Sequence, residues 1–99
     1  MPAPLFIGDE VDAAAWRLTG VRVRDVGPGE VTRAVEEALA GDWELVLLSA
    51  SRAGELTPEL MERFSASVRP LTLVVPDATG RWHPPDLERL VRSRLGMVS

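Results

Sequence analysis

The sequence Glu44-Leu45-Val46-Leu47-Leu48-Ser49 contains four consecutive apolar residues and decides the fold. An apolar run without alternation is typical of a strand that is buried on both faces, because neither face can then point to water. A strand of this kind needs helices on both sides, and amphipathic helical patterns flank it at Pro28 to Ala40 and at Pro58 to Val68. The run is therefore predicted to be the central strand of a parallel sheet.

Three further strands are predicted around this run. Leu5 to Ile7 and Leu71 to Val75 are apolar and are expected to be buried, whereas Val21 to Val26 alternates apolar and charged residues, which is typical of an edge strand. Helical patterns separate the strands, and the connections are too short for anything but right-handed crossovers. The predicted fold class is α/β: a four-stranded, parallel, doubly wound, receiver-like sheet with strand order 2-1-3-4, followed by a C-terminal helix.

The helices are predicted from apolar spacing and from residues that favour helix ends. The first helix is expected to bury a stripe with i, i+3, i+4, i+7 spacing, formed by Val11, Ala14, Ala15 and Leu18. The second is expected to begin at Pro28, since a proline in the first helical position loses no hydrogen bond. Ser49-Ala50-Ser51 is predicted to be a polar loop, and Thr57 is predicted to cap the next helix. The inner face of that helix is expected to contain Leu60, Met61, Phe64 and Val68.

Length, composition and charge exclude several classes of function. A chain of 99 residues forms one core, and we expect a domain of residues 1–84 with a C-terminal helix in residues 85–99. A net charge of −4 argues against nucleic acid or an anionic membrane as the main partner. There is no cysteine, and all 11 basic residues are arginine, so thiol chemistry and a Schiff-base lysine are excluded. Met1-Pro2-Ala3-Pro4 lacks the features of a secretory signal, which favours the cytoplasm.

Acidic residues mark the carboxyl ends of the strands, where doubly wound sheets place their sites. Asp9 and Glu10 resemble the acidic pair with which response-regulator receivers hold magnesium, and Asp77 could be a third oxygen ligand. A receiver also needs an aspartate after the third strand and a lysine, but Ser49 and Ser51 occupy that region and the chain has no lysine. Carboxylates here can instead cap the following helix, and we favour that interpretation. No metal or cofactor is predicted.

The remaining chemical candidates are weaker. His83 is the only histidine and would have to activate Ser49 or Ser51, but no Gly-x-Ser-x-Gly motif surrounds either serine. No glycine-rich phosphate loop follows the first strand. The sequence therefore predicts no enzymatic activity. Among the tryptophans, Trp16 and Trp43 are interpreted as packing residues and Trp82 as a partner contact.

Three motifs, taken in order, resemble the F subunit of V-type (A-type) rotary ATP synthases. The first is Phe6-Ile7-Gly8-Asp9-Glu10 followed by Trp16-Arg17-Leu18-Thr19-Gly20-Val21, in which Trp16 stands where the family usually has phenylalanine. The second is the proline-led strand from Pro70 to Pro76. The third is Leu90-Val91-Arg92-Ser93-Arg94-Leu95-Gly96, which is similar to the closing helix of the family. The resemblance extends from Leu5 to Gly96.

The resemblance implies a non-catalytic central-stalk subunit that couples ATP turnover to proton or sodium transport. Such a subunit is cytoplasmic, peripheral to the membrane, and bound to other subunits of the ATPase head. Its last helix, here Pro85 to Leu95, would lie along the coiled coil of the D subunit. The residues expected to bind the partner are Trp82, Leu87, Leu90, Val91, Arg92, Arg94 and Leu95.

Three alternatives remain open. The chain could be a receiver-like signalling adaptor that has lost phosphorylation. It could also be a small metal-dependent hydrolase using Asp9, Glu10 and Asp77. The helix Pro85 to Leu95 could simply cover the sheet, as helices do in most doubly wound folds.

Overall fold

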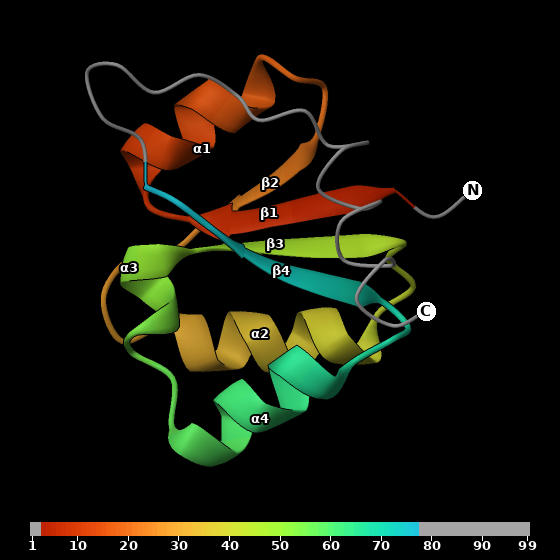
Figure 1. Cartoon of the computed structure of the whole chain (residues 1–99). Coiled ribbons are helices and arrows are strands. Elements are labelled where there is room, and N and C mark those ends of the chain that lie inside the picture. The colour runs from red at the N-terminus through yellow and green to blue at the C-terminus, as the bar shows by residue number, and fades with distance from the viewer. Residues whose placement is uncertain (1–2, 78–99) are drawn as a thin grey trace.

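The protein contains a parallel β-sheet with helices on both faces (Figure 1). The computed structural model describes residues 3–77. Each pair of neighbouring strands is parallel, and the strand order is β2-β1-β3-β4, which confirms the predicted topology. The four strands are β1 (Pro4–Gly8), β2 (Arg22–Asp25), β3 (Leu45–Ser49) and β4 (Leu71–Val75).

Strand β3 is the centre of the fold, as predicted. All five of its residues are buried. Its neighbours β1 and β4 place Phe6 and Leu73 on either side of Leu47. Because successive side chains of a strand point to opposite faces, Leu47 enters one core while Val46 and Leu48 enter the other.

The helices are unequally divided between the two faces of the sheet. Figure 1 shows α1 on one face, with α2 and α4 on the other. None of the helices within residues 3–77 is long and apolar enough to cross a membrane. The helices are α1 (Glu10–Arg17), α2 (Val31–Ala40), α3 (Ala50–Ala53) and α4 (Pro58–Ala66).

Each face of the sheet has its own apolar core. On the α2 and α4 side, the buried stripe of α2 and two residues of α4 pack against β1 and β3; these helix residues are Val31, Ala34, Val35, Ala38, Leu60 and Phe64. On the α1 side, Trp16 stacks on Phe6 with 5.1 Å between the ring centroids. Trp16 is fully buried and Trp43 is partly buried against the other core, so both act as packing residues.

The predicted inner face of α1 is wrong. Val11 is 70% exposed and Leu18 is 86% exposed, whereas Asp12, Ala13 and Trp16 form the buried side. Residues five apart on a helix are separated by about 140° around its axis, so Val11 and Trp16 cannot both face the sheet. The large indole of Trp16 sets the orientation of the helix, because it buries far more surface than the valine.

Two predicted helix boundaries also need correction. Pro28 lies outside α2, because Gly29 has a φ of +84° and the helix begins only at Val31. The predicted polar loop after β3 is the short helix α3, with Ser49 in the N-cap position. In contrast, Thr57 caps α4 as predicted, since its side chain accepts a hydrogen bond from the N–H of Leu60 at 3.2 Å.

Burial is lower than predicted at the end of α4 and along β4. The backbone of Ser67 is extended and ends α4, so Val68 turns away from the core and is 72% exposed. The prediction that Leu71 to Val75 is buried throughout is also wrong. Val74 is 43% exposed, because β4 is an outer strand of the sheet.

The predicted C-terminal helix, Pro85 to Leu95, lies outside the described residues, together with Trp82 and His83. The proposed partner residues from Leu87 to Leu95 and the division at residue 84 stay predictions for the same reason.

Packing at the end of β1 gives a test of the fold. A Cβ added to Gly8 would lie 2.5 Å from the Phe6 ring, which is held beneath Trp16. We expect G8A to lower the free energy of unfolding by about 1 to 3 kcal/mol, because overpacked cores must distort.

Gly54 provides the control, because its φ is −64° and the nearest atom to an added Cβ is 3.5 Å away. G54A should therefore leave stability unchanged or raise it by about 0.4 to 1 kcal/mol. Urea unfolding measures both, and equal midpoints would contradict the packing.

Candidate functional site

Two acidic residues at the carboxyl ends of the strands, Asp9 and Asp77, make structural contacts. Asp9 directly follows β1, and its Oδ1 accepts a hydrogen bond from the N–H of Asp12 at 2.9 Å. Its carbonyl oxygen accepts a second bond from the N–H of Ala13 at 2.8 Å. Asp9 is therefore the N-cap of α1, which confirms the capping interpretation, and its neighbour Glu10 is exposed.

Asp77 serves another helix. Its Oδ1 accepts a hydrogen bond from the N–H of Ser51 at 3.1 Å, which connects the chain beyond β4 to α3. Asp9 and Asp77 thus bind backbone N–H groups of different helices. Nowhere in residues 3–77 do three or more His, Cys, Asp or Glu side chains gather as metal ligands would.

Ser49 is poorly placed for nucleophilic chemistry. It is fully buried at the end of β3, and its Oγ makes no hydrogen bond within the described part of the chain. The hydroxyl lies beneath the surface where a substrate would have to reach it. His83, the catalytic base that was considered from the sequence, is outside the described residues.

A group of polar contacts that we name the Arg52–Glu55 clasp joins two loops at the same edge. Arg52 Nη1 lies 2.7 Å from Glu55 Oε2, and Arg52 Nε donates to the carbonyl oxygen of Val26 at 3.2 Å. Glu55 Oε1 accepts a hydrogen bond from the N–H of Gly29 at 3.1 Å. The clasp therefore holds the β2–α2 loop against the segment between α3 and α4. Sequence analysis missed it, since an Arg and Glu three residues apart indicate only a local pair.

The clasp also changes the ionisation of Glu55. The hydrogen bond from the Gly29 N–H and then the contact with Arg52 lower the pKa of the Glu55 carboxyl group. The pKa of Glu37 in α2 is lowered in a similar way. The contact with Arg24 of β2 is the larger cause, and the contact with Arg33 is the smaller one. Both carboxylates are therefore held in the charged form, which suits structural ion pairs rather than proton transfer.

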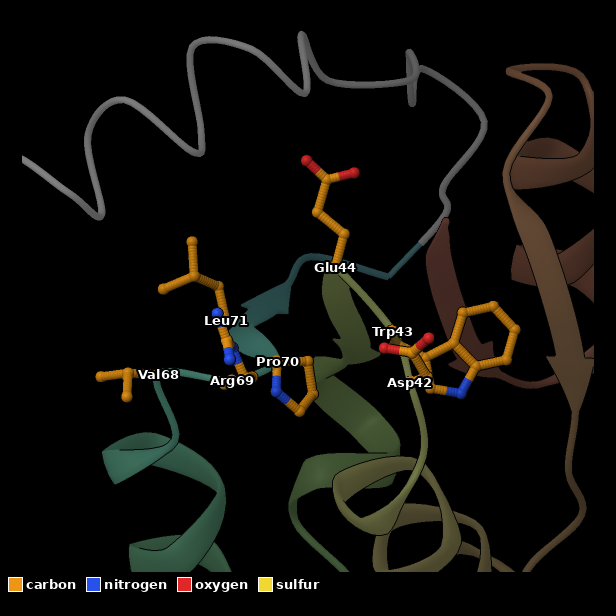
Figure 2. A pocket seen from close by; sticks show the side chains of 7 residues that line it. All are labelled: Asp42, Trp43, Glu44, Val68, Arg69, Pro70 and Leu71. Carbon is orange, nitrogen blue, oxygen red and sulfur yellow. The ribbon is translucent and has the colours of Figure 1, made fainter. Parts of the chain in front are cut away.

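A hollow lies at the opposite, amino-terminal edge of the sheet (Figure 2). We name it the amino-edge hollow, and its volume is about 460 Å³. It forms between the segments that lead into β3 and β4. The residues that line it are Asp42, Trp43, Glu44, Val68, Arg69, Pro70 and Leu71. No sequence motif indicated it, because its two walls are far apart along the chain.

The amino-edge hollow combines apolar and charged groups. Trp43 and Leu71 are half-buried, Pro70 is buried, and Val68 is largely exposed. Figure 2 shows Trp43 and Asp42 on one side of Pro70, with Arg69 and Val68 on the other. The hollow therefore places charged groups beside apolar ones, and its lining contains no Ser, Cys, Thr, Lys or His.

These features define a class: a doubly wound parallel α/β domain in which Asp9, Asp77 and the Arg52–Glu55 clasp make structural contacts at the carboxyl edge. Comparison with solved structures adds a likeness in fold. The structure is similar to the crystal structure of the F subunit of the V-type ATP synthase of Archaeoglobus fulgidus, with a TM-score of 0.66 and 23% sequence identity. The match covers 75% of this chain and 96% of that chain. No family model matches the sequence, and no curated protein matches it.

The clasp predicts how stability depends on pH. Folding lowers the pKa of Glu55 below its ordinary value of 4.5, so its ionised form stabilises the fold above that pH. This contribution disappears as the pH falls through the lowered pKa. We expect E55Q to be less stable than the wild type near about pH 7 and equally stable near about pH 2, where both side chains are neutral.

Thermal unfolding across this pH range measures the effect. Glu36→Gln, at an exposed position of α2, is the matched control and should follow the wild-type profile. If E55Q were destabilised by the same amount at every pH, the destabilisation would not come from the loss of the Glu55 charge.

Proposed function

We propose that the protein is a non-catalytic central-stalk subunit of a V/A-type rotary ATPase, with the role of the F subunit in coupling ATP turnover to ion transport. The observation that carries the proposal is the likeness to the F subunit of Archaeoglobus fulgidus, which includes nearly the whole of that chain. The order of the three sequence motifs supports it independently. In this role the protein would be cytoplasmic and peripheral to the membrane.

The geometry of the carboxyl edge supports a role without catalysis. Asp9 and Asp77 bind backbone N–H groups, and Glu55 is engaged by Gly29 and Arg52. Asp9, Glu10 and Asp77, the residues that a metal-dependent hydrolase would use, do not gather as metal ligands within residues 3–77. The hydrolase alternative therefore has no supporting observation among the described residues.

The signalling-adaptor alternative also lacks a specific observation in its favour. A receiver accepts a phosphoryl group on an accessible aspartate at the end of its third strand. Here the last residue of β3 is Ser49, which is fully buried. A receiver-like strand order alone does not distinguish a signalling domain from a rotor subunit.

The proposed partner is the coiled-coil D subunit, and the proposed contact is the C-terminal helix Pro85 to Leu95 with Trp82. Its apolar stripe continues toward Met97 and Val98, which is more apolar surface than one short helix needs for docking on its own sheet. Arg89, Arg92 and Arg94 flank the stripe in a chain that is acidic elsewhere. These arginines would meet acidic positions beside a coiled-coil seam.

Deletion of residues 85–99 tests the proposal. We expect the shortened protein to remain folded and to lose binding to the D subunit, because the removed stripe serves the partner. Circular dichroism monitors the fold, and a pull-down with the purified D subunit measures binding. If the helix instead covers the sheet, the truncation exposes core surface at ~25 cal/mol per Å² and the domain unfolds. A folded, truncated protein that binds with unchanged affinity would refute the assigned interface.

A further inference from the structure

The side of α1 that faces away from the sheet carries an apolar stripe. Val11 is 70% exposed and Leu18 is 86% exposed, while Ala14 is exposed and Ala15 is half-buried. At about 100° per residue, these four positions fall within an arc of about 100° opposite to the buried Trp16. Leu18 is the C-cap, but its φ of −67° and ψ of −17° continue the helix. We name this surface the α1 stripe, and its width is that with which a helix packs against a neighbour.

The order of residues along the α1 stripe makes it complementary to itself. Its large side chains, Val11 and Leu18, lie at the two ends, and its alanines lie in the middle. Small side chains at the crossing point allow two helices to approach closely. A two-fold axis between Ala14 and Ala15 would place Val11 of one copy opposite Leu18 of the other, because both pairs are centred on the same point of the helix. The stripe therefore matches a second, antiparallel copy of itself.

The charges beside the stripe fit the same arrangement. Glu10 is in the first turn of α1 and Arg17 is in the last. They are seven residues apart, about two turns, so they lie on the same flank of the stripe at opposite ends. Both are exposed, and neither takes part in an ion pair within residues 3–77. In a two-fold, antiparallel pair of helices a flank meets the same flank of the other copy in reverse, so Glu10 of each copy would lie near Arg17 of the other.

We propose that the α1 stripe is a contact surface for a second copy of this chain, in an antiparallel α1–α1 pair with Glu10 of each copy against Arg17 of the other. The inference goes beyond the proposed function and does not depend on it. Helix α1 has eight residues and is about 12 Å long, so the contact is smaller than a standard protein interface. The dimer is therefore transient, with an expected dissociation constant of about 0.1 to 1 mM.

Sedimentation equilibrium of the full-length chain tests the proposal. As the protein concentration rises from about 0.02 to 2 mM, the average mass should increase from that of a monomer toward that of a dimer. V11D places a carboxylate in the apolar contact of both copies and should weaken association about tenfold. V68D is the matched control, because Val68 has nearly the same exposure, 72%, and lies outside the stripe. It should associate like the wild type.

Charge reversal tests the direction of the pair. E10R or R17E alone brings like charges together at both symmetric positions and should weaken association about three- to tenfold. The double variant E10R/R17E restores opposite charges and should dimerise nearly as well as the wild type. E59R and R63E are matched controls, since Glu59 and Arg63 occupy the first and last turns of α4. They should not change association, and thermal melts establish that every variant is folded.

A wild type that remains monomeric up to about 2 mM would overturn the inference. So would a dimer that V11D leaves intact, since the contact would then lie elsewhere. If the double variant associates as weakly as the single variants, the antiparallel pairing is wrong. A monomeric wild type whose binding to the D subunit is weakened by V11D would assign the α1 stripe to that partner instead. Self-association is measured without the D subunit, so failure of the proposed function leaves this inference standing.

Discussion

The burial of β3 on both faces is the constraint on which the rest of the structure depends. A strand without access to water needs a partner strand on each side and helices above and below it. Strands β1 and β4 satisfy its backbone, and the two cores cover its side chains. The polar strand β2 takes an outer position, on the side of β1 that is not paired to β3.

The two ends of the sheet have different uses. At the carboxyl end, Asp9, Asp77 and the Arg52–Glu55 clasp bind backbone groups of the loops and helices. These contacts connect the loops and helices at this edge to one another. At the amino end, the carboxylates of Asp42 and Glu44 form no ion pair within residues 3–77.

The sequence was sufficient to predict the strands and their order, because the alternating run of β2 fits an outer strand and the helical patterns between the runs indicate parallel crossovers. It was also sufficient for Thr57 as a cap, since capping depends on residues close together in the chain. It failed for α1, because the sequence does not show whether Trp16 or the pair Val11 and Leu18 faces the sheet. The stacking of Trp16 on Phe6 determines which side of the helix is buried. It could not indicate the amino-edge hollow, whose shape depends on where Ser67 ends α4 and how β4 aligns with β3.

The outer edge of β4 determines how the sheet is protected from aggregation. Its five residues carry no charge, so electrostatic repulsion does not guard them as it guards β2. The N–H of Leu71 points toward β3, so those of Thr72 and Val74 point outward. The next positions on the same side are Pro70 and Pro76, which have no N–H to donate. An incoming chain finds only two donors on this strand, which is too short a template for amyloid-like growth.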